Sequence, residues 1–600
     1  MKKDHFAALA AASVLGILPF AARGAPVVPV YDFDGVLSES GRAGMSLFDL
    51  DPSAGRPITH FDLVRSLQAA HADEEVKGVV LEVDDTGFSM SQVQEICRHL
   101  VSLRKAGKDV WLYSDRLTLG SALFGAAASH FSLMPEARVV LNGLYAENLY
   151  FKGLFDMIGL QADVVHIGEY KSAGEMFTRE GPSEAARRQT ERLLDALYHQ
   201  IVSHLAEGRT VKPAAVRSFI DAGFQTPEQA LEAGLVDELT YRSDFVRKLR
   251  GQYGAEARFD RSYELPDPGG PEIDGMLDVF SLLFSAGKEK RLKRDFIAVV
   301  ALEGIITRDS AAPVRREILK AARHERCRGL VLRVDSPGGS ALASEILWKA
   351  ADRFRATGRP SAASMAATAA SGGYYVSSSC GRIFAERSTI TGSIGVVGMK
   401  LALGGAMDSL GITAHETKRG RHAGLMNTTR PFTAEERELV RAAMRDTYET
   451  FKQRVAAGRK GRLAGELEAL AGGRVFTGAR AAELGLVDAI GGIHEALEYV
   501  ASEAGLEDYE AHLFPEPKDP IMGLFAAPDE RGKDDEFLRW GGRCEPAAAL
   551  ADQLARHPAV RLLDPSKQRV LRRLAEGLAA FRDERVLLVA PQFRVLLGGN

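Results

Sequence analysis

The sequence predicts an α/β protein in which one domain occurs twice. An internal repeat supports this: residues 78–84 (GVVLEVD) recur as 329–335 (GLVLRVD), and 228–237 (EQALEAGLVD) recur as 479–488 (ARAAELGLVD), both at a shift of 251 positions. Short apolar runs also alternate with amphipathic segments inside each copy, which indicates a parallel sheet with crossover helices. A constant shift over about 150 residues therefore predicts tandem domains of one fold.

The elements of the first copy follow in order from the residue pattern. Runs rich in β-branched residues or leucine predict strands at 79–83, 110–113 and 139–141. Helical periodicity predicts helices at 93–105 and 189–204. We expect the second copy to repeat this order.

Five segments divide the chain: a signal or membrane-anchor segment, a first repeat, a linker, a second repeat and a C-terminal helical extension. A proline- and glycine-rich stretch (PDPGGP) marks the linker, and two amphipathic patterns mark the extension. The predicted boundaries are 1–28, 29–252, 253–294, 295–500 and 501–600, with the linker's turn at 266–271 and the amphipathic patterns at 547–563 and 568–581.

The N-terminus resembles an export signal. Lys2 and Lys3 precede an uncharged run over 6–22, and small residues at signal-peptidase spacing follow it. The run of about 17 residues is at the short limit for a membrane span, so a cleaved signal and a retained anchor are both open. In either case we expect the chain after Ala25 to lie on the periplasmic face of a bacterial inner membrane.

Composition excludes several classes of function. A net charge of −4 over 600 residues, without a basic stripe, argues against a nucleic-acid partner. The four cysteines stand singly, so neither a zinc site nor a disulfide framework is indicated. We expect no metal and no cofactor.

Two glycine-rich turns in the second copy are candidates for chemistry. Residues 335–339 (DSPGG) follow a predicted strand, and a second strand leads into Ser371 and Gly372 before a predicted helix. A serine flanked by such small residues is open to a substrate backbone. The N–H groups of Gly372 and of Gly338 or Gly339 are then candidates to bind a developing oxyanion.

The base for this serine is predicted to be a lysine from the other copy. His415 does not begin a metal-binding HExxH motif, because Arg419 stands at its last position. Lys171 lies in the segment 168–174 (GEYKSAG). A lysine with a pKa of about 10.4 is neutral in only about one molecule in 2,500 at pH 7, so burial must supply about 4 to 5 kcal/mol.

Each copy holds only half of this site. The shift of 251 places Gly120 where the second copy has Ser371, and matching the Ala-Gly pairs places Arg421 where the first has Lys171. Arginine cannot be deprotonated in a protein, so the second copy lacks a base at that position. His422 lies in the matching segment but aligns with Ser172.

Four motifs resemble the signal peptide peptidase A family in its long, duplicated form: residues 335–339 (DSPGG), 370–374 (ASGGY), 391–395 (TGSIG) and 170–173 (YKSA). The resemblance covers about residues 29 to 500. It implies a ClpP/crotonase-like fold in each repeat and a Ser-Lys dyad. By resemblance, Ser371 is the nucleophile, Lys171 the base, Gly372 with Gly338 and Gly339 the oxyanion hole, and Ser393 the residue that orients the lysine.

The resemblance also implies a homotetramer at the membrane that takes peptide substrates. We therefore expect a membrane-associated serine endopeptidase that degrades cleaved signal peptides and other short apolar peptides. One alternative is a crotonase-like enzyme acting on a CoA thioester, against which the export signal argues. The other is a non-catalytic membrane scaffold that only forms rings. A fluorophosphonate label at Ser371 distinguishes the peptidase from both.

Overall fold

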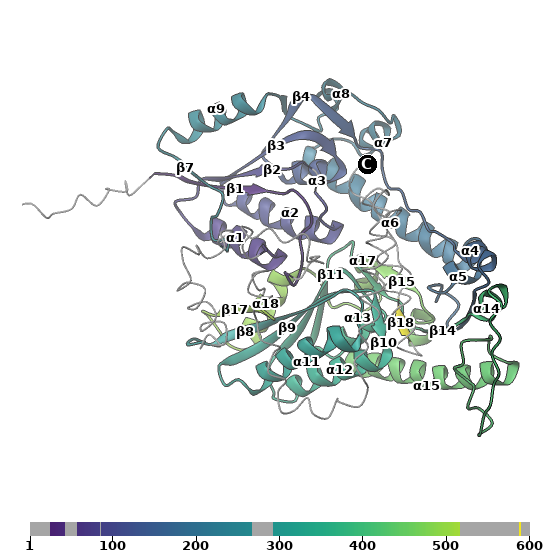
Figure 1. The fold of residues 1–600 in the computed structure, drawn as a ribbon. Coiled ribbons are helices and arrows are strands. Elements are labelled where there is room, and N and C mark those ends of the chain that lie inside the picture. The colour runs from purple at the N-terminus through teal and green to yellow at the C-terminus, as the bar shows by residue number, and fades with distance from the viewer. Residues whose placement is uncertain (1–24, 42–56, 85, 267–291, 517–586, 590–600) are drawn as a thin grey trace, which may run out of the picture.

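The computed structural model describes residues 25–41, 57–84, 86–266, 292–516 and 587–589. The predicted linker turn lies mostly outside these ranges, as do the segment 6–22 and both amphipathic patterns of the extension. Within them, no helix combines the length and apolarity needed to cross a bilayer. Figure 1 shows the first repeat in purple and blue above the second in teal and green.

The first repeat is built on a parallel six-stranded sheet. Its strand order is β6-β4-β3-β2-β1-β7. The strands are β1 (Val27–Asp32), β2 (Gly78–Glu82), β3 (Asp109–Thr118), β4 (His130–Val140), β6 (Glu238–Leu239) and β7 (Arg258–Asp260). The helices are α1 (His60–Ala72), α2 (Met90–Lys105), α3 (Leu119–Ala127), α4 (Lys152–Met157), α5 (Glu175–Thr178), α6 (Glu184–Arg209), α7 (Pro213–Asp221), α8 (Pro227–Glu232) and α9 (Arg242–Tyr253).

The second repeat carries a matching sheet of order β15-β13-β11-β9-β8-β17, in which β12 also pairs with β11, and β16 pairs with β12. Only β15 pairs antiparallel in this sheet. The strands are β8 (Phe296–Glu303), β9 (Cys327–Ser336), β11 (Ser361–Ala370), β12 (Arg382–Ala385), β13 (Ile390–Gly392), β15 (Val475–Thr477), β16 (Ala489–Ile490) and β17 (Glu510–Phe514). The helices are α11 (Arg308–Arg323), α12 (Ala341–Arg355), α13 (Gly372–Ser377), α14 (Gly404–Ser409), α15 (Ala434–Gly458), α16 (Leu467–Leu470), α17 (Gly478–Glu483) and α18 (Ile493–Glu503).

These sheets confirm the predicted α/β class and the tandem repeat. All three strands expected in the first copy are present as β2, β3 and the end of β4, and the expected helices lie within α2 and α6. The strand expected at 139–141 is the end of a longer strand, since β4 begins at His130 and ends at Val140. At the other end, β17 extends the second sheet beyond residue 500 by pairing with β8.

A third sheet joins the two repeats. It has the order β10-β18-β14-β5 and is antiparallel throughout. Its strands are β5 (Gln161–Ile167), β10 (Gly338–Ser340), β14 (Val396–Ala402) and β18 (Leu587–Val589). Because β5 comes from the first repeat and β14 from the second, this sheet brings distant parts of the chain to one place.

Apolar and ionic contacts hold the repeats together. Phe61 and Val64 of α1 pack in one buried cluster with residues of β8, β9 and α18. Beside it, the fully buried Arg333 binds Glu39 of the first repeat, with Nε–Oε2 at 2.8 Å, and lies 3.3 Å from Glu95. Burial by itself raises the pKa of Glu39, but the charges of Arg333 and His60 outweigh burial and lower it.

Candidate active site

Ser371 lies at the turn between β11 and α13, where the backbone is strained. Its φ of +53° is in the left-handed region, which costs a residue with a Cβ about 1 to 3 kcal/mol. Two backbone bonds hold it there: Ser371 donates its N–H to Gly392 O at 2.8 Å, and Tyr375 donates to Ser371 O at 2.8 Å. These bonds hold the backbone of Ser371 in this conformation.

The third sheet brings Lys171 to this turn from the first repeat. Seven register pairs between β5 and β14, from Val396↔Ile167 to Ala402↔Gln161, end four residues before the lysine. Gly473 then fits against the lysine backbone, because a Cβ at Gly473 would lie 2.5 Å from Lys171 N. Lys171 comes from one repeat and is packed by the other.

The lysine amine contacts the serine hydroxyl directly. Lys171 Nζ lies 2.7 Å from Ser371 Oγ, 2.9 Å from Ser393 O and 3.0 Å from Ser393 Oγ. Ser393 also has a left-handed backbone, with φ of +52°. Its N–H donates to Arg474 O at 2.6 Å, which anchors the backbone of Ser393 beside the lysine.

The surroundings of Lys171 favour a neutral amine. The residue is 1% exposed, and burial lowers the pKa of its ammonium group well below the usual value. Its three hydrogen-bond partners in the described part of the chain are two hydroxyls and a carbonyl, so no carboxylate among them compensates a buried positive charge. A neutral amine has a lone pair that can accept a proton.

The predicted oxyanion glycines lie next to Ser371. A Cβ at Gly372 would lie 3.1 Å from Gly338 Cα and 3.2 Å from Gly339 N, so the two turns approach closely. A Cβ at Gly339 would lie 2.1 Å from Ile306 O, which only glycine avoids. Gly338 donates its N–H to Ser336 Oγ at 3.1 Å.

Several residues that support the site were missed from the sequence. Gly392 accepts the Ser371 N–H, and Gly473 and Arg474 support Lys171 and Ser393 through backbone contacts. The glycine pairs at 372–373 and 472–473 are the sequence features that could have indicated these contacts. Nothing in the sequence around the second pair, however, indicates that it packs on Lys171. The sequence also predicts no separate role for Asp335.

Asp335 connects the oxyanion turn to the strand that carries the serine. Its Oδ1 accepts the N–H of Thr368 in β11 at 2.8 Å. Burial, followed by the charge of Glu39, raises the pKa of this carboxyl group to about 7. A carboxyl group with this pKa changes its protonation state near neutral pH.

The charged residues around the matching position of the second copy lie on the surface. Arg421 is exposed and pairs with Glu435 at 2.7 Å, and the exposed Lys418 lies 3.7 Å from Glu416. Within the described residues, the side-chain partner of Ser371 is Lys171 and neither of these two residues. The residues at these positions therefore belong to the surface in this structure.

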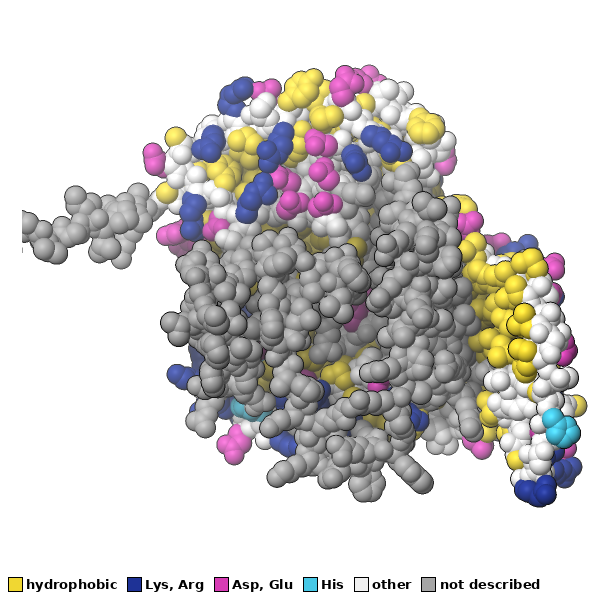
Figure 2. Space-filling view, viewed as in Figure 1, with side chains coloured by type: hydrophobic (Ala, Val, Ile, Leu, Met, Phe, Trp, Pro, Cys, Tyr) yellow, Lys and Arg dark blue, Asp and Glu magenta, His cyan; other side chains and the backbone are white. Residues whose placement is uncertain are grey.

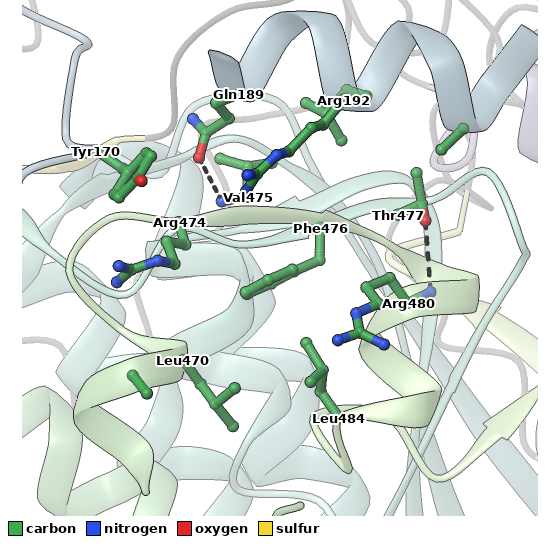
Figure 3. Close-up of a pocket in the computed structure, with 13 residues that line it drawn as sticks. Tyr170, Gln189, Arg192, Leu470, Arg474, Val475, Phe476, Thr477, Arg480 and Leu484 are labelled. Atoms are coloured by element: carbon green, nitrogen blue, oxygen red, sulfur yellow. Dashed lines mark hydrogen bonds between the residues drawn. The ribbon is translucent and has the colours of Figure 1, made fainter. Parts of the chain in front are cut away.

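A pocket of about 470 Å³ lies beside the lysine segment, between α6 and the residues around β15. Figure 3 shows Tyr170 and Gln189 on one side and Arg474, Phe476 and Arg480 on the other. Lys171 and Ser371 do not line it. It is therefore separate from the candidate catalytic groups, although Tyr170 is the neighbour of Lys171 in sequence.

Related proteins include peptidases. The chain is 30% identical to "Serine protease SPPA, chloroplastic" of Arabidopsis thaliana over 72% of this chain and 64% of that protein. It is 27% identical to "Protease 4" of Haemophilus influenzae over 83% of each chain. It is 28% identical to "Protease 4" of Salmonella typhi over 79% of this chain and 76% of that protein.

The family model for peptidase family S49 matches this sequence twice, over residues 102–256 and 353–507. The two matches are separated by the same 251 positions as the internal repeat. Together with the two sheets, they support a tandem ClpP/crotonase-like arrangement. The chain belongs to peptidase family S49 and is a serine-type peptidase.

Proposed function

We propose that this chain is a membrane-associated endopeptidase in which Ser371 is the nucleophile and Lys171 the general base. The observation that carries the proposal is the distance of 2.7 Å between Ser371 Oγ and a buried lysine amine. A nucleophile within hydrogen-bond reach of a base of lowered pKa is the arrangement that covalent catalysis needs.

The proposed reaction begins with the neutral amine. As Ser371 Oγ attacks the peptide carbonyl carbon, its proton passes to Lys171 Nζ. The ammonium group then donates that proton to the departing amine nitrogen, the C–N bond breaks, and an acyl ester remains on Ser371. Water hydrolyses this ester with Lys171 again as the base, which regenerates both groups.

The proposed oxyanion hole consists of the N–H groups of Gly339 and Gly372. Gly338 is the weaker candidate of the turn, because its N–H already donates to Ser336 Oγ. Ser393 is proposed to orient the lysine, since its carbonyl and hydroxyl both lie within 3.0 Å of Nζ. Donors fixed in advance by the fold stabilise the transition state without reorganising.

The proposed substrates are cleaved signal peptides and other short apolar peptides. The export signal at the N-terminus would place the enzyme at the periplasmic face of the inner membrane, where such peptides are released. We also keep the proposed segment boundaries, with the base in 29–252 and the nucleophile in 295–500. No metal or cofactor takes part in this scheme.

A homotetramer is part of the proposal, and an exposed apolar patch supports self-association. Figure 2 shows apolar side chains gathered on the right-hand part of the molecule, where α4 and α14 lie in Figure 1. Exposed apolar residues here include Leu149, Met157, Leu410 and Ile412, of which Met157 and Leu410 are 75% exposed. Patches of this kind mark sites of association with protein or membrane.

The experiment that tests the proposal combines a fluorophosphonate label with a synthetic signal peptide. The full chain in detergent should cleave the peptide and carry the label on Ser371, and the Ser371→Ala variant should do neither. A CoA-thioester enzyme or a scaffold would leave Ser371 unlabelled. Cleavage without a label at Ser371 would contradict the proposed nucleophile.

A further inference from the structure

The pocket between α6 and the residues around β15 takes its walls from both repeats. The α6 residues that line it are spaced at three, four and seven positions, so they share one face of that helix. They are Gln189, Arg192, Leu193 and Ala196. Figure 3 shows this helix above Arg474, Phe476 and Arg480 of the second repeat. Both repeats are therefore needed to form the pocket.

The pocket has an excess of positive charge. Arg192, Arg474 and Arg480 line it, and none of the described residues in its lining is acidic. Arg480 pairs with Glu483, whereas Arg192 makes no hydrogen bond or ion pair with another described residue. Arg474 lies over the ring of Tyr170, with Cζ 4.5 Å from the ring centroid. A guanidinium group without a carboxylate partner in the protein is suited to pair with a carboxylate in a ligand, through two parallel hydrogen bonds.

Between the arginines the lining is mainly apolar. Leucine, alanine and aromatic side chains make up most of it, among them Leu193, Leu470, Phe476 and Leu484. The volume of about 470 Å³ falls within the range of about 300 to 1,000 Å³ that is usual for small-molecule sites. A ligand that fits this pocket therefore combines a negative group with a short apolar body.

Gln189 adds a hydrogen-bond donor without a partner. Its Oε1 accepts the N–H of Val475 at 2.8 Å, which fixes the orientation of the amide and leaves Nε2 as the other end. Gln189 is 5% exposed, and within the described residues its Nε2 has no hydrogen-bond partner. Buried amide groups are nearly always paired. An acceptor oxygen on a ligand in this pocket would satisfy the donor.

We propose that this pocket binds a carboxylate carried on a short apolar body, with the carboxylate paired to Arg192 and the body packed against the leucines and Phe476. Resting on the proposed function, the expected source is a cleaved apolar peptide, because hydrolysis leaves a new carboxylate at the end of each N-terminal fragment. A fatty acid shares this chemistry and is the second source. The site is distinct from the dyad, since neither Ser371 nor Lys171 lines the pocket.

The first test compares ligands by isothermal titration calorimetry. The full chain with Ser371→Ala, in detergent, is titrated with acetyl-leucyl-leucine, with the same peptide as its C-terminal amide, and with hexanoate. The amide should bind at least about tenfold more weakly than the acid, because it lacks the charge that pairs with arginine. Hexanoate that binds as tightly as the acid would assign the site to fatty acids, and weaker binding would assign it to peptide ends.

The second test changes the pocket on one helix. Arg192→Gln keeps a polar side chain but removes the charge, so it should weaken binding of the acid at least about tenfold and binding of the amide less than twofold. Arg187→Gln is the matched control, because Arg187 is also exposed on α6, pairs with Glu184 and does not line the pocket. Ala196→Phe fills the pocket from the same helix face and should weaken binding of both peptides.

The outcomes separate this inference from the proposed function. Equal affinities for the acid and the amide, no binding of either, or equal affinities of Arg192→Gln and Arg187→Gln for the acid would overturn the proposed site. Unchanged binding by Ala196→Phe would overturn its location. Because these titrations need no turnover, their failure concerns the pocket alone. A wild-type Ser371 that takes no fluorophosphonate label would overturn the proposed function, and the titrations would still decide about the pocket.

Discussion

The two repeats share a scaffold but differ at the position where chemistry would occur. Ser89 caps α2 in the first repeat, and Ser340, 251 positions later, caps α12 in the second. Each side chain accepts the backbone N–H three residues on, which satisfies a free donor at the helix start. The two copies therefore share this helix cap, although only one of them has the candidate nucleophile.

The first repeat has no room for a side chain at the position that matches Ser371. Gly120, which matches Ser371, lies inside α3, and a Cβ there would lie 2.2 Å from the methyl group of Thr86. Phe88 stands where the second repeat has Gly339. The N–H of Phe88 donates to Thr86 Oγ1 at 3.3 Å, so the matching backbone donor of the first copy is already used within its own turn.

At the position of the base, the first repeat has the lysine and the second repeat lacks it. In the first repeat β5 leads to Lys171 and pairs with β14, whereas the matching residues 412–418 of the second form no strand. Arg421 is therefore left on the surface, paired with Glu435. The two halves of the proposed site therefore lie on different repeats, the nucleophile Ser371 on the second and the base Lys171 on the first.

The largest effect is expected from removing either half. Ser371→Ala and Lys171→Ala should each lower kcat/KM by about 10⁴-fold or more, because a nucleophile and its base act as a unit. For the same reason the double variant should be no worse than either single one. Steady-state hydrolysis of a synthetic signal peptide measures both, with the exposed Lys418→Ala as the control that keeps activity. Additive losses would contradict the dyad.

The contact between repeats should be the next most sensitive feature. Arg333→Ala leaves the buried carboxylates of Glu39 and Glu95 without their cation, which costs about 3 to 5 kcal/mol of unfolding free energy. Denaturant unfolding monitored by circular dichroism measures the loss. The exposed pair of Arg480 with Glu483 provides the control, since Arg480→Ala should leave the midpoint nearly unchanged. Equal midpoints for both variants would argue against a tightly coupled interface.

The pH profile should report the buried lysine. Because burial lowers the Lys171 pKa, the amine is protonated and inactive at low pH and becomes a neutral base as pH rises. We expect kcat/KM to rise about tenfold per pH unit below the apparent pKa and to level off well below the usual lysine value. Initial rates in overlapping buffers test this. A profile that still climbs at pH 10 would indicate an exposed amine.

A smaller effect is expected at Ser393. Ser393→Ala removes one of three partners of the Lys171 amine and should lower kcat about tenfold with little change in KM. Ser393→Gly is the matched variant, because it also lacks the hydroxyl but adopts the left-handed φ of +52° without strain. Equal losses in the two assign the effect to the hydroxyl. Recovery with glycine alone would assign it to the backbone.

Most of the fold and the two central residues could be predicted from the sequence, whereas the surrounding contacts could not. The repeat and its alternating pattern are local signals, and the exchange of Lys171 for Arg421 is visible once the copies are aligned. The supporting contacts of Gly473 and the position of β18 depend on pairing between segments hundreds of residues apart. No local pattern specifies which distant strand pairs with a sheet edge, since a strand of three residues carries too little side-chain pattern to select its partner.

The smallest expected effect tests whether the second repeat has kept a usable base position. Arg421→Lys in a Lys171→Ala background should not restore hydrolysis, although it supplies an amine at the matching sequence position. The Arg421 side chain is 77% exposed, so a lysine there keeps its proton, and the strand that would carry it toward Ser371 is absent from 412–418. The measurement is kcat/KM on the same peptide, with Lys171→Ala alone as the reference. Recovery of even one per cent of wild-type activity would show that the second repeat can supply its own base, and the division of the site between repeats would have to be given up.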